Sequence, residues 1–207
     1  RLYEEMQKLF LLGSADQAFK LLLDSGLLNA LFPALSQWVY EKSDHLPMVR
    51  GNLEAIDRMV GEGTPPSPGL VLAALFGPNI EEDALAVHRD GIPHQQALDA
   101  VYSAFMKEVG VIVTVPGKIG ARMRDILALQ PFLHRMPPRR PVSTVRKAEF
   151  MDAMAYLRLT AGTKKGYKAT VQWWETFLAE NPSALSPEES PEEAPVKRKR
   201  RRRRKRR

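Results

Sequence analysis

Apolar residues recur at spacings of three and four along most of this 207-residue chain, and glycine or proline interrupts the pattern at short intervals. That spacing places apolar side chains on one face of an α-helix. In the segment 1–12, for example, Leu2, Met6, Leu9 and Phe10 would share a face. Short amphipathic helices bury such faces by stacking on one another. The sequence therefore predicts an all-α fold, a multi-helical body of roughly eight to ten stacked short helices.

Local signals set the limits of several helices. Ser14 is expected to cap a second helix, because serine side chains accept hydrogen bonds from the first free N–H groups of a helix. Pro33 is expected to open another helix, at a position where its missing N–H costs nothing. A helix over 144–160 would be capped by Ser143 or Thr144. The remaining expected helices lie around residues 53–60, 80–89, 94–109, 118–133 and 164–180.

Two apolar stretches leave the secondary structure open. The run 70–76 is apolar on every side and fits a buried strand or a buried helix, and its helical neighbours favour a helix. The run 111–117 is rich in β-branched residues and resembles a strand. A single short strand without a partner is not stable by itself, so we expect a connector there.

The chain closes with eleven consecutive cations, residues 197–207, after a Pro-, Ser- and Glu-rich stretch. Adjacent positive charges repel one another and include nothing apolar to bury, so residues 181–207 are expected to form a disordered linker and tail. Such a run binds a polyanion electrostatically and without sequence preference. RNA is the first expectation for that polyanion. An anionic membrane surface, an acidic protein partner and a nuclear import signal are the alternatives.

Charge is segregated along the chain. Residues 1–117 carry 8 Lys and Arg against 15 Asp and Glu, which gives −7. Residues 118–180 carry 12 against 5, and residues 181–207 carry 11 against 4, so each of these parts gives +7. Segregated charge creates a directed field. We therefore divide the chain into an acidic helical region over 1–117, which the resemblance described below identifies as neck and body, a basic helical region over 118–180, and the linker and tail over 181–207.

Several classes of function find no support in the residues. The chain has no Cys, and hence no disulfide framework, no thiolate metal site and no Cys nucleophile. No apolar run approaches the ~18 residues of a membrane span. The acidic residues 81–83 are interpreted as charges at a helix N-terminus. No catalytic motif is visible, and no metal site is expected, because the four histidines show no ligand spacing; they are His45, His88, His94 and His134.

Several stretches of the sequence resemble a known family. The opening RLYEEMQKLF and the later GLLNALFP (26–33) are similar to the helical neck and body of bacterial poly(A) polymerases. These enzymes belong to a nucleotidyltransferase class that also contains the tRNA CCA-adding enzymes. The segment 116–130, the VQWWETF of 171–177 and the Arg-rich end resemble the C-terminal region of poly(A) polymerases in particular. The GLLxxLFP stretch is expected in the core, with Leu27 and Leu31 buried.

The resemblance implies that the intact protein adds AMP from ATP to RNA 3′ ends, in the polyadenylation that promotes RNA decay, and that this chain is its RNA-holding part. The family's catalytic head uses paired carboxylates to hold two divalent ions. This chain contains no Asp-x-Asp, and its first residue already belongs to an expected helix. We therefore interpret this chain as the later part of a longer protein, and we expect the chain itself to lack the catalytic head. The fragment is expected to be inactive alone and to bind no cofactor, whereas ATP and Mg²⁺ serve the intact enzyme.

Basic residues on both sides of residue 181 are the candidates for RNA contact. The residues before the tail lie on an expected helix and in the stiff linker 135–141, and they would contact RNA phosphates. The Pro-rich linker is extended, so it cannot bury its arginines. The competing interpretation for the helix is a solvated face with ion pairs to Asp125 and its neighbours. The candidate RNA-binding residues are Lys118, Arg122, Arg124, Arg139, Arg140, Arg146, Lys147, Lys197, Arg198, Lys199, Arg200, Arg201, Arg202, Arg203, Arg204, Lys205, Arg206 and Arg207.

Trp173 and Trp174 offer a stacking surface for single-stranded bases, but such a pair more often places one ring in the core and the other over it. The expected partners are RNA with single-stranded 3′ ends and, for the tail, RNA helicase or degradosome proteins. We expect a cytoplasmic protein without a membrane span. Two other functions stay open: the body of a CCA-adding tRNA nucleotidyltransferase, and a non-catalytic helical adaptor tethered to RNA or ribosomes.

Overall fold

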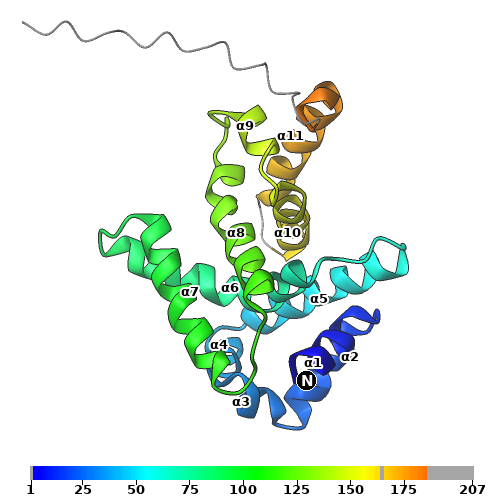
Figure 1. Cartoon of the computed structure of the whole chain (residues 1–207), viewed down its shortest axis with the longest axis vertical. Helices are drawn as coiled ribbons and strands as arrows, with labels where there is room; N and C mark the ends of the chain where they lie inside the picture. The colour runs from blue at the N-terminus through cyan, green and yellow to red at the C-terminus, as the bar shows by residue number, and fades with distance from the viewer. Residues whose placement is uncertain (1, 164–165, 186–207) are drawn as a thin grey trace, which may run out of the picture.

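A computed structural model describes residues 2–163 and 166–185, and the all-α prediction is confirmed for them (Figure 1). These residues form eleven α-helices and one short 3₁₀ helix, η1, and contain no strand. The elements are α1 (Leu2–Leu11), α2 (Ala15–Asp24), α3 (Leu27–Leu31), α4 (Pro33–Glu41), α5 (His45–Gly61), α6 (Pro68–Arg89), α7 (His94–Gly110), α8 (Gly117–His134), α9 (Pro141–Val145), α10 (Phe150–Thr163), α11 (Tyr167–Glu180) and η1 (Pro182–Leu185).

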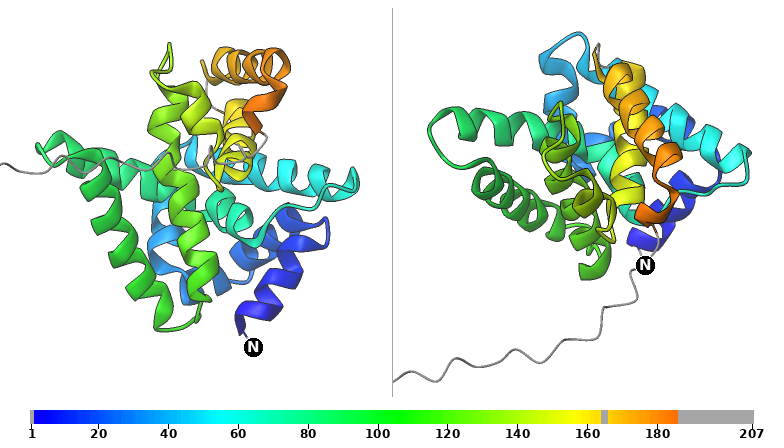
Figure 2. Two further views of the ribbon diagram at one scale, coloured as in Figure 1. Left: turned by 45° about the horizontal axis from the view of Figure 1, so that its top comes forward. Right: turned by 90° about the horizontal axis from the view of Figure 1, so that it is seen from above.

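Helix α6 forms the centre of the body. Every residue from Gly69 to Ile80 is buried, because α6 packs against α5, α7, α8 and α10. Figure 2 shows α7 on one side of it and α5 on the other. A helix that is apolar all round belongs in such a position. The run 70–76 is therefore a helix, as its neighbours favoured. None of the described helices is long and apolar enough to span a membrane.

Pro78 lies inside α6 and does not end it. Because proline has no N–H, the carbonyl of Ala74, four residues earlier, loses its helical donor. Asn52 of α5 is fully buried, and its Nδ2 donates to the Ala74 oxygen at 3.2 Å. This side-chain bond satisfies the carbonyl, and α6 continues to Arg89. The expectation of two separate helices over 70–76 and 80–89 is therefore wrong.

The apolar interior consists of two clusters. The main core gathers side chains from α1–α8 together with Tyr156 and Leu159 of α10. A second, smaller core lies between the C-terminal part of α8, α9, α10, α11 and η1. Trp174 is fully buried in it, and its Nε1 donates to the carbonyl of Leu133 at 3.0 Å. That bond satisfies one of the free carbonyls at the end of α8 and joins α11 to it.

The helix expected over 144–160 is divided in the structure. Helix α9 ends at Val145 and α10 begins at Phe150, and both side chains are buried in the second core. On one continuous helix, residues five apart would face directions about 140° apart. The turn over 146–149 brings both inward. Neither Ser143 nor Thr144 caps a helix here, and the Thr144 hydroxyl donates to the carbonyl of Arg140 instead.

The expected cap of α2 is also replaced. The Ser14 side chain makes no cap bond. The carboxylate of Asp57, from α5, accepts the N–H groups of Ala15 at 2.6 Å and Asp16 at 3.1 Å. A negative charge at a helix N-terminus is stabilising. Asp16 accepts two further bonds from Arg50 at 2.8 and 2.7 Å, so α2 is fixed to α5 at both residues.

The expectations for Pro33 and for the connector after α7 are confirmed, whereas the expected burial of Leu27 is wrong. Pro33 occupies the first turn of α4, and residues 111–116 connect α7 to α8 without helix or strand. Leu31 packs against the main core. Leu27, however, is 50% exposed, and the neighbouring Leu28 is the buried residue at 1%.

This difference gives a matched pair of variants. Leu28→Asp is expected to lower the free energy of unfolding by several kcal/mol, because it buries an unpaired charge. Leu27→Asp, one residue away, is expected to change it by about 0.5 kcal/mol or less, as at an ordinary surface site. Urea unfolding followed by circular dichroism measures both. Equal losses in the two variants would contradict the assignment of the buried face.

Candidate nucleic-acid interface

Helix α9 and the C-terminus of α8 lie at one end of the molecule (Figure 1). Exposed cations gather in the segments around α9. Helix α8 ends here. Residues 135–140 connect it to α9, and the turn over 146–149 connects α9 to α10. We call this group the α9 basic cluster. It comprises Arg135, Arg139, Arg140, Arg146 and Lys147, all of which are exposed.

The cluster contains a groove and an exposed aromatic ring. An open groove of about 450 Å³ is lined by Arg140, Ser143 and Arg146 together with Pro141 and Val142. Phe132 of α8 is 55% exposed, and the Lys147 ammonium lies 5.9 Å from its ring centroid. Positive charge beside an exposed ring is the combination that binds single-stranded nucleic acid, through phosphate contacts and base stacking. Phe132 was missed in the sequence. The helical period could have found it, because Gln130 and Leu133 share the buried face of α8 and Phe132 lies on the other face.

Arg122 and Arg124 have structural partners instead of lying in the cluster. The Arg122 Nε lies 2.7 Å from Asp152 Oδ2, which also accepts the Ser67 hydroxyl at 2.8 Å. Ser67 in turn caps α6 through the Leu70 N–H. These bonds join α8, α10 and the N-terminus of α6.

Arg124 pairs across to α7 and within its own helix. Its guanidinium lies 2.7 Å from Asp99 and 3.0 Å from Asp125. The hydrogen bond to Asp99 raises the pKa of Arg124. Ion pairs with Asp125 and its neighbours were the competing interpretation of this helix, and the structure contains them.

Lys118 lies apart from the cluster. It is exposed in the first turn of α8, whereas Arg135 follows the last turn. An 18-residue helix is about 27 Å long, so the two ends of α8 are separated by that distance. The structure therefore groups four of the seven candidates that precede the tail, and these are Arg139, Arg140, Arg146 and Lys147.

The eleven candidates in the tail lie outside the described residues, as do Lys164 and Lys165. Leu185 is the last of the described residues and belongs to η1, which packs against α9. The chain therefore leaves the described body beside the α9 basic cluster. In the sequence, residues 186–196 separate Leu185 from the cations of residues 197–207.

One tryptophan of the pair Trp173 and Trp174 lies in the core and the other lies over it, which is the more common arrangement of such a pair. Trp174 is buried in the second core. Trp173 is partly buried and stacks on Phe177, with ring centroids 5.4 Å apart and planes 7° apart. The two rings line an open groove of about 330 Å³ on α11. Trp174 is thus unavailable for base stacking.

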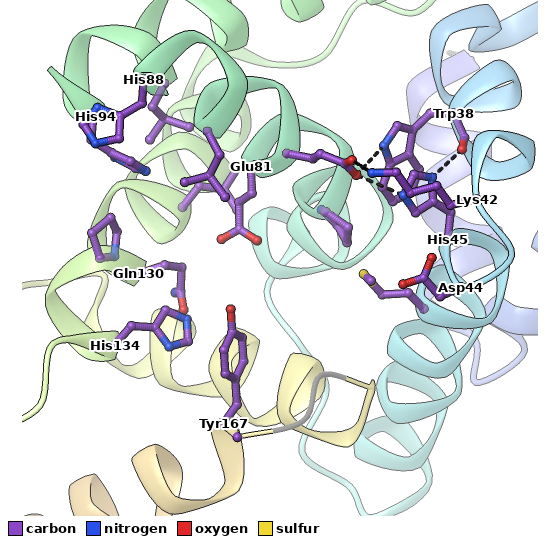
Figure 3. Close-up of a pocket in the computed structure, with 18 of the residues that line it drawn as sticks. Trp38, Lys42, Asp44, His45, Glu81, His88, His94, Gln130, His134 and Tyr167 are labelled. Atoms are coloured by element: carbon purple, nitrogen blue, oxygen red, sulfur yellow. Dashed lines mark hydrogen bonds and ion pairs between the residues drawn. The ribbon is translucent and has the colours of Figure 1, made fainter. Parts of the chain in front are cut away.

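A second feature was missed in the sequence, because its residues are far apart along the chain. One pocket of about 730 Å³ is lined by all four histidines together with Glu81, Glu82 and Gln130 (Figure 3). We call it the four-histidine pocket. It lies between α4, α5, α6, α7, α8 and α11. Among the described residues, no three His, Asp or Glu side chains converge closely enough to hold a metal ion.

Comparison with known proteins assigns the chain to a family. Residues 90–207, more than half of the chain, match the family described as "Polymerase A arginine-rich C-terminus". The chain belongs to this family. Residues 1–39 match a second family, described as "Probable RNA and SrmB- binding site of polymerase A". The resemblance seen in the sequence is confirmed by both matches.

Curated relatives agree with this assignment. The chain is 27% identical over 188 residues to "Poly(A) polymerase I" of Escherichia coli O6:H1, and equally to that of Escherichia coli O157:H7. It is 26% identical over 185 residues to "Poly(A) polymerase I" of Haemophilus influenzae. These alignments cover 88% and 87% of this chain but 40% and 41% of the relatives. The chain thus spans about two fifths of their length.

The ion pairs of α8 lead to a stability prediction. Arg122→Ala is expected to lower the free energy of unfolding by about 1–2 kcal/mol, because it removes charged hydrogen bonds in a partly buried network, where solvent screens part of the interaction. Lys118→Ala, one turn away and exposed, is expected to stay within about 0.5 kcal/mol of the parent. Thermal unfolding checks both. A stable Arg122→Ala protein would show that the network with Asp152 and Ser67 does not hold α8 in place.

Proposed function

We propose that this chain is the RNA-holding C-terminal part of a poly(A) polymerase, and that the whole protein adds AMP from ATP to RNA 3′ ends. The observation that carries the proposal is the match of residues 90–207 to the arginine-rich C-terminus of polymerase A. The α9 basic cluster and the eleven cations of residues 197–207 support it. ATP and Mg²⁺ would be bound by the part of the protein that the relatives have and this chain lacks.

The proposed contact is electrostatic. Cations in the α9 basic cluster and in residues 197–207 would neutralise phosphates and release their counterions. Phe132 would stack on one base beside Lys147. Binding of this kind tolerates any sequence, which suits an enzyme that extends many different RNAs. Arg122 and Arg124 would then contribute chiefly by holding α8, which presents the cluster.

One match bears on the partners of this protein, and its cellular location is a prediction from the sequence alone. The match of residues 1–39 to a family described as an RNA- and SrmB-binding site favours α1–α4 as a further contact surface, for RNA or for a protein. An RNA helicase or degradosome partner for the tail stays a prediction, as does a cytoplasmic location.

A CCA-adding enzyme and a non-catalytic adaptor are the rival functions. Incubating the full-length protein with RNA and all four nucleotides separates the three. A poly(A) polymerase extends RNA by runs of A, a CCA-adding enzyme incorporates C and A, and an adaptor extends nothing. Extension by C and A would contradict the proposal.

The salt dependence of RNA affinity tests the proposed contacts. If roughly six of the eleven cations in 197–207 engage phosphates at once, deleting them should flatten the log–log slope by about 4. Arg139→Ala with Arg140→Ala should flatten it by about 1. The control is Arg58→Ala with Arg89→Ala, two exposed arginines outside the cluster, which should leave the slope unchanged. A tail deletion that altered neither slope nor affinity would make another polyanion the better choice.

The fragment itself should be inactive. Residues 1–207 alone are expected to incorporate no AMP into RNA with ATP and Mg²⁺, because the chain contains no Asp-x-Asp to hold the two metal ions. Denaturing gels with labelled RNA measure this, with the full-length protein as the positive control. Mg²⁺-dependent extension by the purified fragment would overturn the expectation.

A further inference from the structure

The α9 basic cluster lies beside the point from which the last part of the chain continues. Ala184 of η1 and Val145 of α9 are both buried in the second core, so η1 is fixed to α9 by apolar contacts. Leu185, the last residue of η1, is 47% exposed. The residues that follow Leu185 therefore begin at the surface next to α9.

The sequence that follows Leu185 is strongly acidic. Residues 186–196 read SPEESPEEAPV, in which the motif Ser-Pro-Glu-Glu occurs twice. They contain four glutamates and no lysine or arginine, and hence carry a net charge of −4. We call residues 186–196 the acidic segment. It lies outside the described part of the chain. The glutamates are Glu188, Glu189, Glu192 and Glu193.

The acidic segment is long enough to reach the cations around α9. Its glutamates lie three to eight residues after Leu185. An extended chain spans at most about 3.3–3.6 Å per residue, so they can reach about 10–28 Å from that point. Helix α9 has five residues and is therefore only about 7.5 Å long. Arg140 and Arg146, which flank α9 directly, are within this range.

The described residues leave the charge of the α9 basic cluster largely unbalanced. Residues 135–149 carry five cations and one acidic residue, Glu149, which gives a net charge of +4. The fold pairs Arg122 and Arg124 of α8 with aspartates. By contrast, the three arginines that connect α8 to α9 form no ion pair with a carboxylate of the described residues. Opposite charges of equal size are thus placed next to one another along the chain.

We propose that the acidic segment occupies the α9 basic cluster in the absence of RNA and competes with RNA for it. The inference rests on the proposed function, because the cluster is the proposed RNA contact. A segment on a short tether is present at an effective concentration in the mM range. Each exposed ion pair is weak, so the occupancy is reversible.

Competition of this kind selects the ligand by its number of charges. An RNA strand engages several cations at once and releases counterions, so it displaces the acidic segment. A small anion with few charges, such as a free nucleotide, must compete with four tethered carboxylates and is excluded. The apparent affinity of any ligand is reduced by the fraction of molecules in which the cluster is free.

The contact can be tested without RNA. The chain contains no Cys, so Ala194→Cys carries a single nitroxide spin label just after the last glutamate. The label broadens the amide NMR signals of residues that it approaches. The comparison chain carries the same label on a four-Gln variant, so the tether itself contributes equally to both. This variant combines Glu188→Gln, Glu189→Gln, Glu192→Gln and Glu193→Gln.

The parent is expected to show stronger broadening than the four-Gln variant at the amide signals of residues 139–147. This excess should be lost in about 1 M salt, where the Debye length falls to about 3 Å. Equal broadening in the two chains would overturn the proposal. An excess that appears only after residues 197–207 are deleted would also overturn it, because the tail cations would then hold the glutamates in the full chain.

RNA affinity tests the competition, in chains that end at Val196 so that the tail cations do not mask the effect. The four-Gln variant is expected to bind single-stranded RNA about fivefold more tightly, because the loss of a few weak ion pairs frees the cluster. A control variant makes the same change in net charge at exposed carboxylates outside the cluster, and it should gain about twofold or less because of screening. It combines Asp24→Asn, Glu41→Gln, Glu54→Gln and Glu62→Gln.

Adding Arg139→Ala with Arg140→Ala should reduce the gain of the four-Gln variant to that of the control, because the acidic segment then loses its site. A gain that persists in this background, or an equal gain in the control, would overturn the competition. The two proposals fail in different ways. If RNA does not use the cluster, the double alanine change leaves the salt slope unaltered while the spin-label excess persists. If the acidic segment does not dock, the slope changes and the excess is absent.

Discussion

The burial of α6 on every side is the constraint on which the rest of the structure depends. A helix can be surrounded this closely only if its neighbours approach without side chains in between. A Cβ added to Gly77 would lie 2.5 Å from the Tyr156 hydroxyl, and one added to Gly69 would lie 2.6 Å from the Cγ of Arg122. Real Cβ atoms do not make such contacts, so glycine at these two positions lets α8 and α10 come as close as they do.

The same close approach sets up both of the surfaces discussed above. Tyr156 reaches across α6 to Glu81 because Gly77 leaves room for its ring, and Glu81 is thereby fixed at the edge of the four-histidine pocket. Arg122 passes Gly69 to reach Asp152, and this bond orients α8. The C-terminus of α8, with Trp174 bonded to the Leu133 carbonyl, then carries the α9 basic cluster. The positions of Glu81 and of α8 thus depend on the close packing of helices around α6.

The sequence predicted what depends on local period and composition. It identified the fold class, the helix at 70–76, the connector after α7 and the burial of one tryptophan of the pair, because apolar spacing and helix breakers act over a few residues. It failed where a distant residue intervenes. Asn52 satisfies the carbonyl that Pro78 leaves free, and Asp57 replaces Ser14 as the cap of α2. The four-histidine pocket was missed for the same reason, since only the folded chain brings its histidines together.

Helix α8 contributes to two different features from its opposite faces. Leu127, Gln130 and His134, at spacings of three and four, share the face that lines the four-histidine pocket. Phe132 lies about 200° around the helix from Gln130 and is exposed next to Lys147. The pocket lined by all four histidines and the α9 basic cluster therefore lie toward opposite faces of the same few turns of α8. The helix also contributes to both apolar clusters, through Met123, Ile126 and Leu127 to the main core and through Leu129 and Leu133 to the second core.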